Sequence, residues 1–175
     1  LARHRDGVTV LDLDYRPRFW ADEASASEAV ARVLGSVDVA IGNLEECRIA
    51  VGESDPERAA DALLDRGVEI AFVKQGPTGT RVKSRTERAF VPAFPIEVVN
   101  GLGAGDAFGG AVCHGLLNGW GIEQIATFAS AAGAIVAARL ACSAAMPRQD
   151  EVAELLAAAG RGFEMEDGLA TTTPT

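Results

Sequence analysis

The chain has 175 residues, of which 48% are hydrophobic, and it carries a formal net charge of −9 at pH 7. This length and composition predict one globular domain with a full core rather than a disordered chain. The negative charge argues against nucleic acid or an anionic membrane surface as a partner, because both are bound mainly through Lys and Arg. A small anionic ligand is compatible with it, since local backbone amides can outweigh the net charge.

Three cysteines, Cys47, Cys113 and Cys142, lie far apart and form no CxxC pair. We therefore expect free thiols in a reducing cytosol rather than a disulfide framework or a zinc site. No run of apolar residues is long enough to predict a transmembrane helix. The first residues, LARHRDGVTVLDLDY, do not have the pattern of a signal peptide and lack an initial Met, so we expect the chain to begin part-way through a longer protein.

In the first half of the chain, predicted strands and helices alternate. Ser25 with Glu28 predicts a capped helix that Gly35 ends, and Asp55 with Pro56 predicts the start of a second helix. The expected elements are a strand at 8–15, a helix at 25–35, a buried strand at 37–42, a loop or short helix at 43–52, a helix at 55–67 and a strand at 68–74.

The second half begins with a turn and becomes mostly helical. After QGPTGT at 75–80, TRVKS and ERAFVPAF predict a hairpin of two exposed strands, and IEVV at 96–99 has the pattern of a further strand. Strands that alternate with helices predict an α/β domain over residues 1–160 with a largely parallel sheet. The remaining expected elements are helices at 105–119, 122–140 and 150–160, and a disordered tail at 161–175.

The stretch GLGAGDAF at 101–108 places three glycines and one acid before a predicted helix. It is neither the phosphate loop, which needs Gly-Lys-Ser/Thr, nor the dinucleotide fingerprint, whose third glycine would stand at Asp106. We predict a glycine turn in which the free N–H groups of Gly103, Ala104 and Gly105 point outward together. With the helix dipole they would form a site for an anion, or for negative charge that develops during a reaction.

Asp106 would lie in the first turn of that helix, beside the anion site. It is either an acid that the helix dipole stabilises or a general base that takes a proton from a hydroxyl group while phosphate charge spreads onto the amides. His114 follows two turns later, and we expect it to be a packed or exposed helix residue rather than a catalyst. The residues alone leave both interpretations of Asp106 open.

Polar residues follow the ends of two predicted strands, where ligands bind in open α/β sheets. Asn43 and Glu46 would share one face of a coiled segment and offer oxygens to a hard cation such as Mg²⁺, although a helix cap followed by a solvated acid gives the same spacing. Lys74 could meet a phosphate, with Gly76 and Gly79 allowing a close approach, although an ordinary turn has the same residues.

Charged residues also end the first predicted strand, in DLDYRPRFW at 12–20. At a period of two, Asp12, Asp14 and Arg16 would project from one strand face. Arg16 could bind the carboxylate or the hydroxyl groups of a sugar acid through its forked guanidinium. An ion-paired strand end is the alternative.

Each of these signals is modest, but their order along the chain is specific. DLDYR, NLEE, KQGPTG and VNGLGAGDAFGGA follow one another, and a helix rich in small residues comes next. In this order they resemble the ribokinase-like (PfkB) carbohydrate kinase family over about residues 8–158. The flanks of GAGD, DLDYRPRFW and CSAAMP look most like the branch that phosphorylates 5-dehydro-2-deoxygluconate in inositol breakdown. Kinases of 2-keto-3-deoxygluconate share the D-x-D/N-x-R-P pattern.

The resemblance implies a ribokinase-like three-layer α/β/α fold with a mainly parallel sheet, here without the N-terminal part and the lid. The implied reaction is transfer of the γ-phosphoryl group of ATP to a primary hydroxyl of a sugar acid, with Mg²⁺ as cofactor. Asp106 would match the catalytic base, residues 103–105 the anion hole, and Asn43 and Glu46 the motif that organises Mg²⁺ through water. Arg16, with Asp14 beside it, would touch the substrate. The residues implied for the nucleotide are Lys74, Gly76, Gly79, Ser130 and Gly133, the last two near adenine.

This sequence departs from the family pattern in two places. Many relatives have Asp-Thr-Thr where Asn100, Gly101 and Leu102 stand, and that Asp helps to form a monovalent-cation site in some of them. Family members are also longer, and their N-terminal half supplies most sugar contacts. Two other functions therefore stay open, a nucleotide-binding module without catalysis and a remnant fold that acts through protein contacts. The expected free thiols favour a cytoplasmic location. We also expect a homo-oligomer, because association would hide an uncovered sheet edge and apolar face.

Overall fold

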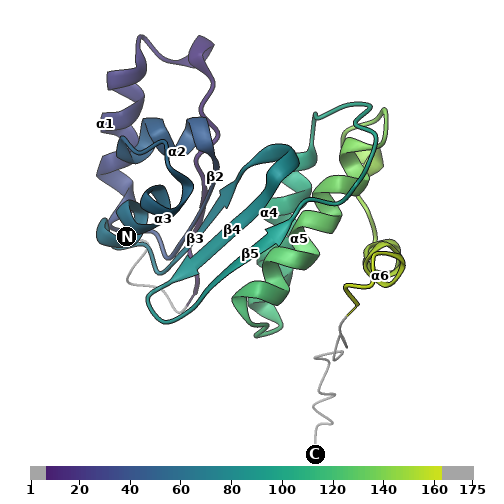
Figure 1. Cartoon of the computed structure of the whole chain (residues 1–175). Coiled ribbons are helices and arrows are strands. Elements are labelled where there is room, and N and C mark those ends of the chain that lie inside the picture. The colour runs from purple at the N-terminus through teal and green to yellow at the C-terminus, as the bar shows by residue number, and fades with distance from the viewer. Residues whose placement is uncertain (1–6, 163–175) are drawn as a thin grey trace, which may run out of the picture.

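Short runs rich in Val and Ile form the strands of one five-stranded sheet, which lies between two layers of helices (Figure 1). The computed structural model describes residues 7–162. The first three strands pair in parallel, and the last two continue the sheet as an antiparallel hairpin. In spatial order, which is also chain order, they are β1 (Val10–Asp12), β2 (Val39–Asn43), β3 (Ile70–Lys74), β4 (Gly79–Ser84) and β5 (Arg88–Pro92).

Helices cover both faces of this sheet, as Figure 1 shows. Three follow the parallel strands and pack on one face, and the later helices pack on the other. They are α1 (Glu23–Leu34), α2 (Leu44–Val51), α3 (Pro56–Asp65), α4 (Ala104–Leu117), α5 (Ile122–Ala137) and α6 (Gln149–Ala158).

The alternation of side chains along each strand builds two separate cores. On β2, Ala40 belongs to the cluster formed with α1, α2 and α3, whereas Val39 and Ile41 belong to the cluster formed with α4, α5 and α6. Phe72 of β3 meets Phe108 of α4 edge to face, with ring centroids 6.0 Å apart. The predicted three-layer α/β/α fold is therefore confirmed, with a sheet that is parallel in its first three strands and antiparallel in the hairpin.

The start of α1 differs from the prediction. Asp22, not Ser25, caps the helix, and its Oδ1 accepts hydrogen bonds from both the amide and the hydroxyl of Ser25. Because Asp is at least as good a cap as Ser, the helix begins at Glu23, two residues earlier than expected. At α3 the prediction is confirmed, since Asp55 accepts hydrogen bonds from two backbone amides and Pro56 is the first helical residue.

Two predicted strands are shorter or absent. The backbone turns at Asp14, whose φ of 30° lies in the left-handed region, so β1 ends at Asp12. Residues 96–99 form a loop in which Val98 is 67% exposed, because Pro95 precedes the run and no neighbouring strand pairs with it. The loop is held instead by the amide of Val99, which donates to the carbonyl oxygen of Ala137 at 2.8 Å.

The hairpin forms, but its first strand is not exposed. Thr80 and Val82 of β4 are buried, because β4 lies between β3 and β5 and is covered by helices. Only β5 keeps an open edge among the described strands of the hairpin. No helix within residues 7–162 is both long enough and apolar enough to cross a membrane. The predicted tail lies outside the described residues from 163 onward.

Candidate active site

The predicted polar residues converge where two parallel strands end and α4 begins. Asn43 is the last residue of β2 and Lys74 the last residue of β3, and the two are direct partners in the strand register. A Cβ atom built on Gly105 of α4 would lie 3.7 Å from the Nζ atom of Lys74. The ammonium group therefore lies against the N-terminal turn of α4.

The turn before α4 leaves two backbone amides without an acceptor among the described residues. Gly103 caps the helix with a φ of 85°, and its carbonyl oxygen accepts the first helical hydrogen bond, from the amide of Ala107. The amide of Ala104 donates to the carbonyl oxygen of Gly101 at 3.3 Å, which closes the turn. Of the three amides expected to be free, those of Gly103 and Gly105 have no acceptor within residues 7–162. These two amides and the helix dipole favour a negatively charged ligand.

Asn43 and Glu46 bond to each other at the start of α2. The Oδ1 atom of Asn43 accepts from the amide of Glu46 at 2.9 Å, and the Oε2 atom of Glu46 accepts from the amide of Asn43 at 2.6 Å. This capping box is the helix cap of the alternative interpretation, but its acid is buried rather than solvated. Glu46 is only 8% exposed, and burial raises the pKa of its carboxyl group, opposed by the hydrogen bond from Asn43 and by the charge of Lys74.

The donor set suits a cation that keeps its own water. The described part of the chain holds no group of three or more His, Cys, Asp or Glu side chains placed to bind a metal alone. The capping box uses Oε2 of Glu46 and leaves Oε1 for another partner. Mg²⁺ commonly binds through one or two carboxylates, several waters and the phosphates of a ligand, and Glu46 beside the Lys74 site fits that pattern.

A pocket of about 780 Å³ opens beside Lys74 and the start of α4. Its walls come from the ends of β2 and β3, the turn at 76–79, the loop after β5 and the middle of α5. One end therefore carries the ammonium group and the helix N-terminus, and much of the remaining wall is apolar. The predicted residues that line it are Asn43, Lys74, Gly76, Gly79, Ala104, Gly105, Ser130 and Gly133.

Sequence reasoning missed two parts of this wall. Thr80 is buried, pairs with Lys74 in the β3–β4 register and accepts a hydrogen bond from the hydroxyl of Ser130 at 3.2 Å. The loop from Phe94 to Val98 forms another side of the pocket, although its apolar run had the pattern of a strand. The prolines at 92 and 95 were the signal that argued against a strand there.

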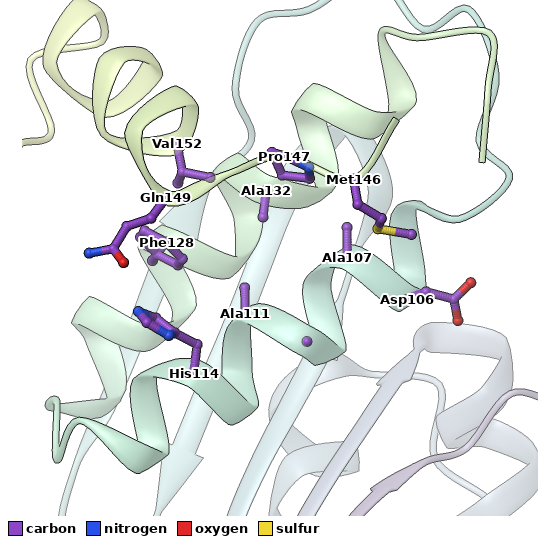
Figure 2. A pocket seen from close by; sticks show the side chains of 11 residues that line it. Asp106, Ala107, Ala111, His114, Phe128, Ala132, Met146, Pro147, Gln149 and Val152 are labelled. Atoms are coloured by element: carbon purple, nitrogen blue, oxygen red, sulfur yellow. The ribbon is translucent and has the colours of Figure 1, made fainter. Parts of the chain in front are cut away.

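Asp106 lies outside the large pocket and faces solvent at the start of α4. Figure 2 shows it at one end of a smaller cavity of about 310 Å³, with its carboxylate directed away from His114 at the other end. His114 stacks on Phe128 and meets Trp120 edge to face, with ring centroids 5.6 and 5.2 Å away. Of the two expected states, packed or exposed, these contacts make His114 a packed helix residue.

Arg16 and Asp14 do not project from a strand, which corrects the period-two prediction. β1 ends at Asp12, whose Oδ1 accepts from the amide of Asp14, and the Nε atom of Arg16 donates to Oδ1 of Asp14 at 2.9 Å. Both side chains are about half exposed, and neither lines the large pocket. Asp12 and Asp14 lie near enough to Glu46 for their charges to raise its pKa, so they belong to the same edge of the sheet.

A family model described as the pfkB family carbohydrate kinase matches residues 1–149. The chain is 32% identical over 160 residues to a 5-dehydro-2-deoxygluconokinase from Geobacillus thermodenitrificans, which covers 89% of this chain and 48% of that protein. It is 34% identical over 155 residues to the protein of the same description from Photobacterium profundum, which covers 85% of this chain and 47% of the relative. The chain thus spans about half the length of the curated relatives it matches.

The solved structures lead to the same fold. An E. coli protein assigned as a ribokinase II, solved in complex with ATP and Mg²⁺, superposes with a TM-score of 0.80 at 28% identity. The match covers 89% of this chain and 50% of that one. The sheet and the helices described above are therefore those of one half of a larger domain in the solved relative.

Proposed function

This chain belongs to the pfkB family of carbohydrate kinases, and we propose that it takes part in transfer of the γ-phosphoryl group of ATP to a primary hydroxyl of a sugar acid. One observation carries the proposal. The Lys74 ammonium and the N-terminus of α4 meet at one end of a pocket large enough for a nucleotide, with Ser130 and Gly133 in its wall. Relatives described as 5-dehydro-2-deoxygluconokinase favour that acid as the acceptor, with 2-keto-3-deoxygluconate as the alternative.

In this proposal the pocket binds ATP with its phosphates toward α4. Lys74 and the amides of Gly103 and Gly105 stabilise the charge on the transferred group, while the α5 wall borders adenine. Glu46 and Asn43 would hold Mg²⁺ through water, and the ion would supply positive charge to the phosphates. The apolar loop at 94–98 closes one side of the pocket and excludes water from it.

Asp106 is proposed as the base. Its place in the first turn of α4, next to the anion-binding turn, allows it to accept the proton of the attacking hydroxyl group. A new bond then forms between that oxygen and the γ-phosphorus, and the bond to the bridging oxygen of ADP breaks. ADP leaves with the electron pair of that bond.

A second function, nucleotide binding without catalysis, is favoured by one observation. Arg16, the residue expected to touch the acid, is paired with Asp14 and does not line the pocket. Positioning both reactants supplies much of the rate of phosphoryl transfer, so a nucleotide pocket alone does not ensure turnover.

Thermal unfolding with nucleotide separates the candidates. ADP with Mg²⁺ at about a hundred times its dissociation constant should raise the melting temperature by about 5–10 °C, because only the folded chain binds it. No shift at millimolar ADP would contradict both the kinase and the module. A shift without phosphorylation of any sugar acid would favour the module.

Asp106→Asn tests the role of the base. We expect the rate of phosphorylation to fall about 10²- to 10⁴-fold while the ADP-induced shift stays the same, because the carboxylate moves a proton and does not line the pocket. Glu123→Gln, which changes the exposed acid in the first turn of α5, is the matched control and should leave the rate unchanged. Turnover retained in Asp106→Asn would remove Asp106 from this role.

A further inference from the structure

Asn100 ties the turn before α4 to the segment that follows α5. Its Nδ2 atom donates to the carbonyl oxygen of Leu140 at 3.2 Å, and its Oδ1 atom accepts from the amide of Leu102 at 3.0 Å. Its backbone amide donates to the carbonyl oxygen of Ala137 at 3.0 Å. The side chain therefore uses both its donor and its acceptor, in directions that only an amide can serve together.

The same two segments shape the anion-binding turn. Gly103 follows Asn100 by three residues, and a Cβ atom at Gly103 would lie 2.7 Å from the Sγ atom of Cys142, in the segment after α5. A shift of that segment would therefore move the glycine that caps α4. Asn100 acts on the phosphate site through this contact and does not line the pocket itself.

Side-chain donors bind two main-chain oxygens of the segment after α5. The side-chain amide of Asn100 donates to the carbonyl oxygen of Leu140. The guanidinium of Arg139 donates to the carbonyl oxygen of Ala145 at 2.9 Å and pairs with Glu151. Main-chain carbonyl oxygens are the ligands that K⁺ takes in proteins. A neutral amide and an arginine at this junction do not fit a cation site, because they satisfy the oxygens and add no negative charge.

We propose that Asn100 is a positioning residue whose amide does the work that a monovalent cation does in relatives with Asp at this place. An aspartate at 100 could not donate to Leu140, and its charge beside the carbonyl oxygens would favour a bound cation. The inference rests on the proposed function, because the turn that Asn100 positions is the proposed phosphate site. It predicts that folding and nucleotide binding in this chain do not depend on K⁺.

The test compares melting temperatures in KCl, NaCl and choline chloride at equal ionic strength, which keeps general screening constant. The unchanged chain should melt at the same temperature in all three salts. Asn100→Asp should melt lower in choline chloride and recover by about 2–4 °C in KCl, the shift expected for about 1 kcal/mol in a chain of this size. Asn118→Asp, at the end of α4, is the matched control and should show no response specific to K⁺.

The affinity for ADP is the second measurement. In the unchanged chain it should differ less than twofold between KCl and choline chloride, and in Asn100→Asp it should improve about tenfold with KCl. Asn100→Ala, which removes the amide without adding charge, should bind ADP several-fold more weakly in every salt. It keeps the inference testable if the aspartate variant does not fold.

Two results would overturn the inference. One is a K⁺-specific rise in melting temperature or ADP affinity in the unchanged chain, and the other is a folded Asn100→Asp that does not respond to K⁺. The melting comparison needs neither nucleotide nor sugar, so it stands even if ADP fails to bind. Failure of ADP binding or turnover would instead count against the proposed function.

Discussion

At the scale of a single residue, Gly103 controls the geometry of the turn before α4, which we propose binds an anion. Its φ of 85° is a backbone conformation that residues other than glycine rarely adopt, and the Sγ atom of Cys142 fills the space of a Cβ. Gly103→Ala should therefore destabilise the fold by about 1–3 kcal/mol and weaken ADP binding, as measured by urea unfolding and calorimetry. Gly101→Ala is the control, because a Cβ there meets nothing within 4 Å. Equal stability of the two variants would contradict the strain argument.

Glu46 should make stability depend on pH. Burial raises the pKa of its carboxyl group in the folded state, so between the unfolded and folded pKa values the folded chain binds more protons. Stability linked to this group is therefore present below its unfolded pKa, near 4.5, and is lost as the pH rises through the folded pKa.

Glu46→Gln tests this sign. Gln keeps an oxygen for the amide of Asn43 but has no charge to bury, so the variant should gain melting temperature relative to the unchanged chain at pH 7.5 and less at pH 5. Glu45→Gln, which changes the exposed neighbour, should show no such trend. In the kinase assay the Glu46 variant should need more Mg²⁺. If the difference in melting temperature between Glu46→Gln and the unchanged chain did not vary with pH, the buried-carboxyl interpretation would be contradicted.

At the scale of an element, α4 combines two kinds of glycine. A Cβ on Gly115 would lie 2.7 Å from Cγ1 of Ile125, because α4 and α5 pack closely there, whereas a Cβ on Gly110 would meet nothing within 4 Å. Gly115→Ala should cost about 1–3 kcal/mol by overpacking. Gly110→Ala should stabilise the helix by about 0.5–1 kcal/mol, because Ala is the better helix former. Urea unfolding measures both, and effects of the same sign would contradict this packing.

At the scale of the whole molecule, one face of α4 is left open in the described structure. Gly110, Cys113 and Leu117 share a helix face and are exposed, with Leu117 at 88%, and β1 has no strand on its outer side. Exposed apolar residues on one helix face favour association, so we expect the chain to form homo-oligomers. Sedimentation should show more monomer for Leu117→Glu than for Val33→Glu, the control on α1. A chain that is monomeric at high concentration would contradict the expectation.

Local patterns predicted most elements, because their causes are local. Asp55 with Pro56 marked the start of α3, and the glycines before Asp106 marked the turn into α4. The exceptions were also informative. Asp22 outcompeted Ser25 as a cap, and the apolar run at 96–99 had no partner strand, which a pattern in one segment cannot reveal.

By itself, the sequence predicted most strands and helices in their order, the glycine turn and the residue types at each strand end. Only the tertiary structure decided which of them meet. Ser130 bonds to Thr80 and Asn100 to Leu140, pairs that are 50 and 40 residues apart in the chain. The tertiary structure also separated Arg16 from the large pocket and turned the carboxylate of Asp106 away from His114. Periodicity and capping act within a few residues, whereas these contacts depend on how the layers pack across the sheet.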